Sequence, residues 1–295
     1  MFIKKLSNIT RQMSTYLLPK KGFYFLGMIL VRIIRYFRKI TNRNLLERDY
    51  QTVTVYPGSK MRVDRLSYMG GSLYWTGFHH INEILFLKSF LRQDMVFIDV
   101  GANQGEFSIF AAKLLSQGKV IAFEPVSYSR NLLEKNKHIN QFHNLEIIPC
   151  GLGNQETRLP IFTTSYDPAY AGRNDGLSSV YKTEYRNCFE EIIDITVFDT
   201  HFLTSMTRMD FVKIDIEGGE LYALQGMKQS LLKFKPWILI EVGNDTIEAA
   251  GYTIDDLIHF FNDIDYSFYA IKRGVLQNSK ITKFDYWGNY IVRPN

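Results

Sequence analysis

Short apolar runs and helical patterns alternate along this chain from residue 95 to its last residues. Apolar runs typical of buried strands occupy 95–100, 119–124, 145–150, 210–216, 237–242, 266–271 and 285–292. Residues at helical spacing occupy 105–117, 127–139, 217–228 and part of 246–263. Strands that alternate with helices predict an α/β fold, in which a mostly parallel sheet has helices on both faces. Because ligands bind outside the carboxyl ends of such strands, we expect the chemistry just after residues 100, 124, 150, 215 and 242.

The remaining segments divide the chain further. We expect a main domain over 93–295, preceded by a lead-in segment over 47–92 with short strands and a helix near 80–91. Segment 164–192 breaks the alternation and is too long for a plain connection. Its polar, aromatic and glycine-containing sequence fits a lid or acceptor-binding loop, and it fits a solvated excursion equally well.

Basic residues concentrate at the N-terminus. Residues 1–46 hold ten of the 35 Lys and Arg side chains and none of the 30 Asp and Glu side chains. Residues 47–295 therefore hold the other 25 basic side chains and all 30 acidic ones, which makes the main body mildly acidic. A surface that binds nucleic acid needs cations along the phosphates, so this distribution argues against a nucleic-acid partner.

The N-terminal arm, residues 1–46, contains a basic amphipathic helix predicted over 22–40. Its apolar run before Arg32 is about ten residues long, whereas a transmembrane helix needs ~20. Such a helix suits peripheral contact with a membrane surface, but it could also pack on the body or belong to a targeting segment. The two cysteines, Cys150 and Cys188, are too few for a disulfide scaffold, so a reducing, cytoplasmic location is the simpler expectation.

The first strand of the main domain leads into a glycine-containing loop with the sequence FIDVGANQGEF, residues 97–107. The dinucleotide fingerprint G-x-G-x-x-G needs glycine where this chain has Asn103 and Glu106, and no Gly-Lys-Ser/Thr follows as in a P-loop. Instead, Asp99 offers a carboxylate at the strand end, and Gly101 and Gly105 allow a tight turn beside a ligand. A cofactor with an amine and a ribose but no phosphate fits this set, and S-adenosylmethionine has these properties.

An acid also ends the second strand of the main domain. Glu124 stands ~20 residues beyond the loop, where an acid holds the ribose hydroxyls in dinucleotide folds. Glu124 alone does not distinguish NAD from S-adenosylmethionine. Tight turns and a helix-capping acid remain a purely structural explanation of the same residues.

Four segments, in this order, resemble the FkbM-family methyltransferases, which use S-adenosylmethionine. They are FIDVGANQGEFSIFAA (97–112), AFEP (122–125), VKIDIEGGELYALQGM (212–227) and ILIEV (238–242). The resemblance implies a class I methyltransferase fold, a Rossmann-like sheet of seven strands with the last one antiparallel, and methylation of hydroxyls on sugars, glycolipids or natural products. It also implies a set of cofactor-binding residues: Asp99, Gly101, Asn103 and Gly105 at the methionine end, Glu124 at the ribose, and Cys150 and Gly151 near the adenine.

Carboxylates at adjacent strand ends are the candidates for catalysis. An alcohol that attacks a methyl group must lose its proton, so a base within hydrogen-bond reach helps. Asp215 ends the strand beside the first one and is the best placed, Glu217 follows on the same loop, and Glu241 ends the next strand. Together they could act as a base, orient an acceptor or bind a divalent ion, although the sequence does not require a metal. Glu217 also suits the start of a helix, where the dipole favours an acid.

His79 and His80 precede the first strand of the main domain. Either could act as the base, although adjacent histidines at the start of a helix are more often structural. The leading hypothesis is an S-adenosylmethionine-dependent O-methyltransferase that acts on a hydroxyl of a sugar, glycolipid or similar small molecule. The alternatives are a nucleic-acid methyltransferase and a non-catalytic partner-binding protein that retains the fold.

Overall fold

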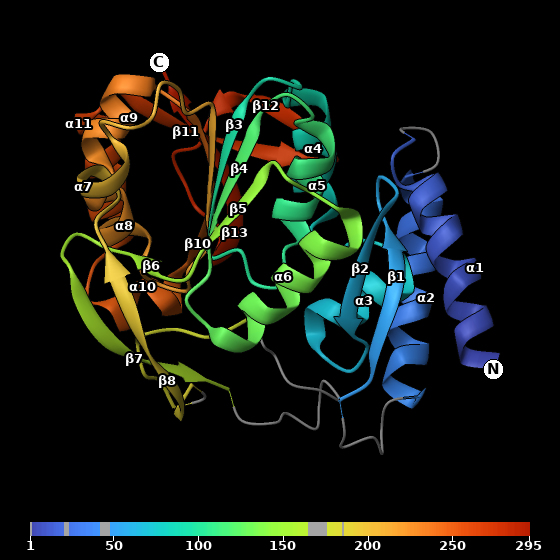
Figure 1. The fold of residues 1–295 in the computed structure, drawn as a ribbon. Helices are drawn as coiled ribbons and strands as arrows, with labels where there is room; N and C mark the ends of the chain where they lie inside the picture. The colour runs from blue at the N-terminus through green and yellow to red at the C-terminus, as the bar shows by residue number, and fades with distance from the viewer. Residues whose placement is uncertain (1, 21–23, 42–47, 165–175, 185) are drawn as a thin grey trace.

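The centre of the molecule is a large, mostly parallel sheet. A computed structural model describes residues 2–20, 24–41, 48–164, 176–184 and 186–295. The sheet has eight strands in the order β12-β11-β13-β10-β9-β3-β4-β5 (Figure 1). The strands from β10 to β5 in this order run parallel, whereas β13 is antiparallel to both β10 and β11. The prediction of a mostly parallel sheet with its last strand antiparallel is confirmed.

All seven predicted strands of this sheet are present, and the eighth, β12, differs from the expectation. Its sequence, VLQNSK, is polar and largely exposed at the edge of the sheet, so it carries no apolar run that predicts a strand. The strands are β3 (Val96–Val100), β4 (Lys119–Phe123), β5 (Leu145–Ile148), β9 (Phe211–Ile214), β10 (Trp237–Gly243), β11 (Tyr266–Lys272), β12 (Val275–Lys280) and β13 (Trp287–Pro294).

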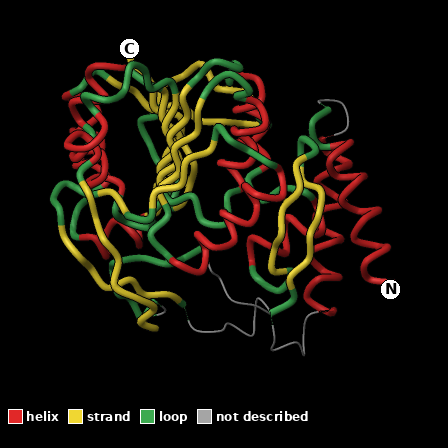
Figure 2. Tube along the Cα trace, in the orientation of Figure 1, coloured by secondary structure: helices red, strands yellow, loops and turns green. Residues whose placement is uncertain are grey.

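Helices cover both faces of the sheet, as Figure 2 shows with the strands in yellow between two groups of red helices. Alternate residues of a strand serve the two layers: Phe97 belongs to the apolar core under α4 and α5, and Ile98 to the core under α8 and α11. The helices on one face are α4 (Ile81–Phe90), α5 (Glu106–Leu114) and α6 (Ser127–Asn140); those on the other are α7 (Phe198–Phe202), α8 (Glu220–Gly226), α9 (Lys228–Phe234), α10 (Asn244–Ala250) and α11 (Ile254–Asp263).

The chain forms a second sheet after β5. It has three strands in the order β6-β8-β7, with bounds β6 (Gly151–Leu152), β7 (Thr157–Thr163) and β8 (Cys188–Thr196). Most of segment 164–192 precedes β8, and its residues 165–175 and 185 lie outside the described residues. The described part is not a solvated excursion, because Arg186 is fully buried and residues 176–181 line a cavity.

The N-terminal residues form a helical layer against the lead-in segment. Helices α1 (Phe2–Leu17) and α2 (Tyr24–Thr41) lie beside α3 (Tyr68–Thr76) and the hairpin of β1 (Tyr50–Val55) and β2 (Ser59–Asp64) (Figure 1). Thr10 Oγ1 of α1 donates a hydrogen bond of 2.9 Å to the Trp75 carbonyl. Leu18, Trp75 and Phe97 belong to one apolar core, so the arm and the lead-in pack together with the main sheet.

The helix predicted over 22–40 corresponds to α2, whereas α1 was not predicted. The sequence of α1, FIKKLSNITRQMSTYL, separates the apolar positions with Ser, Thr and Asn, and these residue types favour helices only weakly. Within the part of the chain that the structure describes, no helix is both long and apolar enough to cross a bilayer.

Candidate active site

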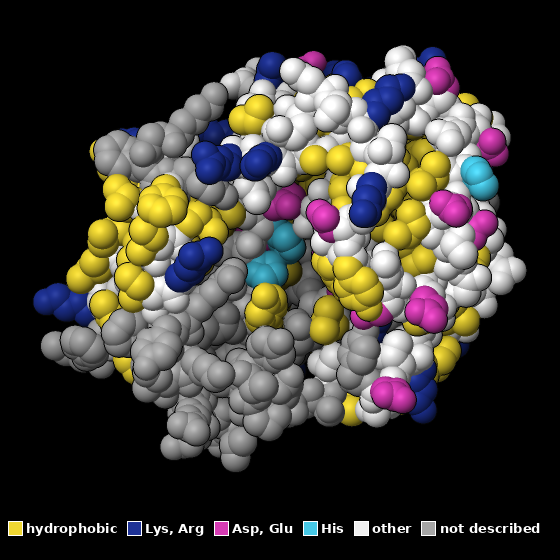
Figure 3. Space-filling view, turned by 180° about the vertical axis from the view of Figure 1, so that it is seen from behind, with side chains coloured by type: hydrophobic (Ala, Val, Ile, Leu, Met, Phe, Trp, Pro, Cys, Tyr) yellow, Lys and Arg dark blue, Asp and Glu magenta, His cyan; other side chains and the backbone are white. Residues whose placement is uncertain are grey.

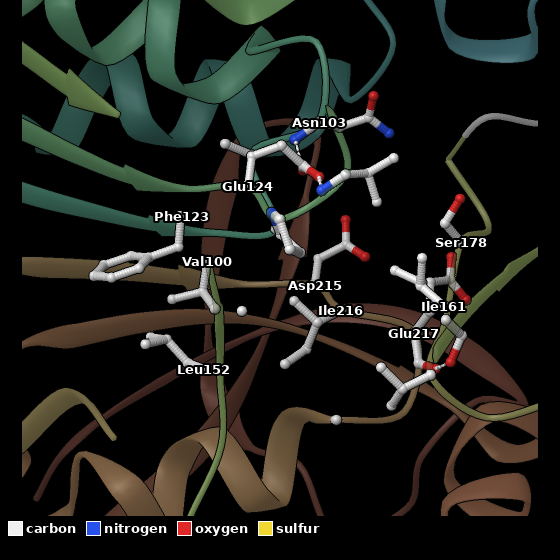
Figure 4. Close-up of a pocket in the computed structure, with 18 of the residues that line it drawn as sticks. Val100, Asn103, Phe123, Glu124, Leu152, Ile161, Ser178, Asp215, Ile216 and Glu217 are labelled. Atoms are coloured by element: carbon white, nitrogen blue, oxygen red, sulfur yellow. Dashed lines mark hydrogen bonds between the residues drawn. The ribbon is translucent and has the colours of Figure 1, made fainter. Parts of the chain in front are cut away.

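A cavity of about 730 Å³ lies at the carboxyl ends of the central strands. Its lining includes residues just beyond β3, β4, β5 and β9, where the sequence predicts the chemistry. Strands β6, β7 and β8, residues 176–181 and residues 79–80 also contribute to the lining. Figure 4 shows Asp215 pointing into the middle of this space, with Glu124 and Asn103 on one side and Glu217 and Ser178 on another.

The loop between β3 and α5 makes one wall of the cavity, and its residue types follow from its backbone. Gly101 has a φ of +77°, and a Cβ atom there would lie 2.0 Å from the Asp215 carbonyl oxygen, so only glycine fits. Asn103 also has a positive φ, of 50°, which asparagine tolerates better than most residues. Its Oδ1 accepts a hydrogen bond of 2.7 Å from the Gln104 amide, which holds the turn.

The predicted cofactor residues divide into two groups by position. Gly101, Asn103, Glu124 and Gly151 line the cavity. Asp99, Gly105 and Cys150 are not part of the lining and support it from behind. Asp99 is fully buried, accepts a hydrogen bond of 2.5 Å from Ser108 Oγ and has a pKa raised by burial.

Glu124 joins the ends of the first two strands of the main domain. Its Oε2 accepts a hydrogen bond of 2.6 Å from the Asn103 amide, and its Oε1 accepts one of 2.9 Å from the Val126 amide (Figure 4). Burial raises the pKa of Glu124 to about 7, against the lowering effect of these two amides. The side chain therefore fixes the loop on one edge and faces the cavity on the other.

Three carboxylates meet in the cavity. Asp215 and Glu217 come from the loop after β9 and Glu241 from the end of β10, and one ligand oxygen from each lies within 4.8 Å of the others. Lys213 Nζ lies 3.5 Å from Asp215 Oδ2 and donates a hydrogen bond of 2.7 Å to the Gly101 carbonyl. The sequence thus brings together all three predicted catalytic residues.

Two further residues partner these carboxylates. Arg186 Nη1 lies 3.1 Å from Glu217 Oε2, and Trp287 Nε1 donates a hydrogen bond of 2.8 Å to Glu241 Oε1. Neither was singled out from the sequence. Arg186 lies in the irregular segment 164–192 and Trp287 at the start of β13, and no local pattern connects either of them to an acid after β9 or β10.

The pKa values of the three carboxylates are shifted in different directions. Burial opposes the ionisation of Asp215, but the positive charge of Lys213 and the nearby His80 hold its pKa below the usual value. Burial and the charge of Asp215 raise the pKa values of Glu217 and Glu241 well above theirs. Asp215 is therefore the carboxylate that stays ionised, and the two glutamates can hold protons beside it.

Carboxylate oxygens at this spacing could also hold a divalent cation. The cluster does not need one for charge balance, because Lys213 and Arg186 already place positive charge against Asp215 and Glu217. A metal is therefore not required by the geometry.

The lining of the cavity fits an amine-bearing cofactor better than a phosphate-bearing one. Acids line it (Glu106, Glu124, Asp215, Glu217 and Glu241), and among the described lining residues Lys213 alone is a Lys or Arg. Phosphates would face carboxylates here, whereas a methionine ammonium and ribose hydroxyls would find hydrogen-bond acceptors. The fold and the site define a methyltransferase that uses S-adenosylmethionine.

Comparison with known proteins gives the family. Residues 99–268 match the methyltransferase FkbM domain, and the chain belongs to the FkbM family of methyltransferases. It is 25% identical over 181 residues to Methyltransferase sdnD of Sordaria araneosa, and the aligned region covers 52% of this chain and 67% of that protein. It is 24% identical over 150 residues to Methyltransferase 1 of Beauveria bassiana, covering 45% of this chain and 59% of that one.

A solved structure of methyltransferase FkbM from Methylobacillus flagellatus KT is also similar. The similarity covers 88% of this chain and 58% of that chain, with 18% sequence identity and a TM-score of 0.45. The resemblance inferred from the four sequence segments is confirmed by the family match.

Proposed function

We propose that this protein transfers a methyl group to a hydroxyl of a sugar, a glycolipid or a similar small molecule. The observation that carries the proposal is the position of the Asp215 carboxylate, which points into the middle of the cavity with Glu217 and Glu241 beside it (Figure 4). Carboxylates accept hydrogen bonds from hydroxyl groups, and several of them around one space suit an acceptor with several hydroxyls.

In this proposal the residues have separate tasks. Gly101, Asn103, Glu124 and Gly151 bind the cofactor, with Asp99, Gly105 and Cys150 behind them. The bound cofactor supplies a methyl group on a sulfonium, whose carbon–sulfur bond breaks, with the electron pair left on sulfur, as the acceptor oxygen bonds to carbon. Asp215 accepts a hydrogen bond from the acceptor hydroxyl and favours the loss of its proton, while Glu217 and Glu241 orient the acceptor.

The test uses labelled methyl transfer from S-adenosylmethionine into fractionated cell extract, with identification of the labelled compound. We expect Asp215→Asn to lower transfer by about 10²-fold, the usual cost of an acceptor held out of position, while calorimetry finds cofactor affinity nearly unchanged. Asp263→Asn, at an exposed position of α11, is the matched control and should transfer like the wild type. Wild-type transfer by Asp215→Asn would remove Asp215 from catalysis. Label in RNA or DNA would favour the nucleic-acid alternative, and no cofactor binding at all would favour the non-catalytic one.

We also propose peripheral contact between the N-terminal arm and an anionic membrane surface. Large apolar side chains are exposed on its two helices: Ile9, Met13 and Tyr16 on α1, and Phe25, Leu26, Ile29 and Ile33 on α2. Figure 3 shows apolar side chains gathered beside Lys and Arg on this part of the surface. With ten basic and no acidic residues in 1–46, the charge suits anionic lipid.

Vesicle sedimentation tests this contact. The double variant Phe25→Ser, Ile29→Ser should bind phosphatidylserine-containing vesicles about tenfold more weakly than the wild type, because two apolar side chains no longer enter the interface. Val275→Ser removes an exposed apolar side chain of β12 and serves as the control. Equal binding by the wild type and the double variant would show that this face does not contact lipid.

A further inference from the structure

A buried glutamate and a histidine form a pair at the edge of the cavity. Glu106 is the first residue of α5, and its side chain is 5% exposed. Its Oε2 lies 2.9 Å from His80 Nδ1. Its Oε1 accepts hydrogen bonds from the backbone amides of His79, at 2.6 Å, and His80, at 3.2 Å. One carboxylate therefore fixes both the loop before α4 and the ring of His80.

The surroundings of the pair favour its charged form. Glu106 stands in the first turn of α5, where the helix dipole favours an anion. Burial opposes ionisation of Glu106, but the hydrogen bond and charge of His80 bring its pKa below the usual value. Burial likewise opposes protonation of His80, but Glu106, Glu83 and Asp215 together raise its pKa above the usual value. The titratable groups beside His80 are thus acids from α4, α5 and the loop after β9, together with the His79 ring, whose centroid lies 4.4 Å from that of His80.

One nitrogen of the His80 ring has no hydrogen-bond partner among the described residues. Because Nδ1 faces Glu106, Nε2 lies on the opposite side of the ring, and no described residue hydrogen-bonds to it. His80 lines the cavity, and its side chain is 18% exposed. Figure 3 shows histidine side chains in a hollow of the surface.

The aromatic ring of Phe107 lies near both His80 and Lys213, the partner of Asp215. The His80 ring centroid lies 5.1 Å from that of Phe107, and Lys213 Nζ lies 5.5 Å from the same centroid. Lys213 in turn lies 3.5 Å from Asp215 Oδ2. Asp215 is also among the charges that raise the pKa of His80, and both residues line the cavity.

We propose that His80 is the catalytic residue that takes the proton of the acceptor hydroxyl, and that Glu106 is the residue that positions it. The inference rests on the proposed function. Nδ1–H of neutral His80 donates a hydrogen bond to the Glu106 carboxylate, which leaves the lone pair on Nε2 for the proton of the acceptor hydroxyl. As the oxygen bonds to the methyl carbon, its proton moves to Nε2, and the resulting imidazolium is balanced by the Glu106 carboxylate. Asp215 stays ionised throughout and orients the hydroxyl.

A purely structural role for Glu106 predicts a different outcome in Glu106→Gln. The amide oxygen of glutamine can still accept from the His79 and His80 amides, so the loop keeps its anchor. The amide nitrogen, however, donates to Nδ1, which forces the ring proton onto Nε2 and blocks it as an acceptor. If His80 accepts the proton, Glu106→Gln should lose methyl transfer but remain folded. If Glu106 has only a structural role, Glu106→Gln should remain folded and should also keep its methyl transfer.

The experiment compares the wild type, His80→Gln, Glu106→Gln and the exposed control His138→Gln. Three quantities are measured: labelled methyl transfer into cell extract from pH 5.5 to 9, S-adenosylmethionine affinity by calorimetry, and the tautomer and pKa of His80 by nitrogen NMR. In the wild type, transfer should rise with pH through the His80 pKa, because the neutral ring is the acceptor. His80→Gln and Glu106→Gln should lose about 10²- to 10⁴-fold in methyl transfer and keep cofactor affinity within threefold of the wild type. The control His138→Gln should match the wild type in both quantities.

In Glu106→Gln the NMR should also show the ring proton on Nε2 and a lower His80 pKa, since the partner charge is gone. Transfer by His80→Gln within threefold of the wild type, with the same pH dependence, would overturn the inference while the proposed function stands. If the wild type binds the cofactor but labels nothing, the proposed function fails. The NMR result then still decides the positioning role, since an unchanged tautomer in Glu106→Gln refutes it and a reversed one supports it.

Discussion

Replacement of Gly101 by alanine tests how closely the loop after β3 and the loop after β9 fit together. A Cβ atom at this position would lie 2.0 Å from the carbonyl oxygen of Asp215 and 2.8 Å from Cγ2 of Ile216. The carbonyl belongs to the backbone, so it cannot rotate away as a side chain would. To reach 3.0 Å, the loop after β3 and the loop after β9 must separate by about 1 Å.

The cost of the change has two sources. A non-glycine residue at a φ of +77° costs about 1–2 kcal/mol. Relief of the clash costs about 1–3 kcal/mol, as for other additions to a well-packed region. The sum is about 2–5 kcal/mol, or a fall in Tm of roughly 4–10 °C for a domain of this size. A shift of about 1 Å at Asp215 should also reduce methyl transfer by about 10²-fold.

Gly251→Ala is the matched control for this experiment. Gly251 has a similar φ of +82°, but a Cβ atom there meets nothing within 4 Å. Its Tm should fall by only ~2–4 °C, from the backbone cost alone, and transfer should be unchanged. Thermal denaturation and labelled methyl transfer are measured on both variants. Equal results for Gly101→Ala and Gly251→Ala would refute the claim that the approach of the two loops matters.

Two further predictions concern charge in the cavity. Because the pKa of Glu124 is about 7, the carboxylate is mostly protonated at pH 6 and mostly ionised at pH 8, and we expect S-adenosylmethionine affinity to rise about tenfold over this range. Calorimetry should find the rise absent in Glu124→Gln, and a flat profile in the wild type would contradict the role of Glu124. Arg186→Met removes the cation beside buried Glu217 and should lower the free energy of unfolding at pH 8 by about 3–5 kcal/mol. The loss should be smaller at pH 5, because burial and the charge of Asp215 raise the pKa of Glu217, and its protonation as the pH falls removes the charge that Arg186 balances; denaturant titrations that give equal losses at both pH values would argue against the pair.

The cofactor side of the site is predictable from sequence because it is local. Gly101 and Asn103 show their roles through backbone geometry, since positive φ values restrict the residue types that fit. Asp215 and Glu241 are predictable because Asp215 directly follows the apolar strand β9 and Glu241 lies near the carboxyl end of the apolar strand β10. In these cases the neighbouring residues in the sequence are enough to predict where the side chain lies in the fold.

Other features depend on distant parts of the chain and leave no local trace. Arg186 meets Glu217 across 31 positions of sequence, and Trp287 meets Glu241 across 46. The N-terminal arm is a similar case. Its amphipathic pattern is visible, but Thr10 and Leu18 reveal only in the structure that the arm packs on the lead-in while Phe25 and Ile29 stay exposed.

Part of the cavity lining comes from residues outside the FkbM domain match. That match covers residues 99–268 and includes the cofactor loop, Glu124 and the three carboxylates. His79, His80 and Trp287 lie outside it, and all three line the cavity. Glu106, inside the match, reaches out of it to hold His79 and His80. A glycine at position 106, as in the dinucleotide fingerprint, would leave two partly buried backbone amides without that acceptor, at up to about 1–3 kcal/mol each. The residue that departs from the fingerprint therefore attaches the lead-in segment to the start of α5, directly after the loop that follows β3.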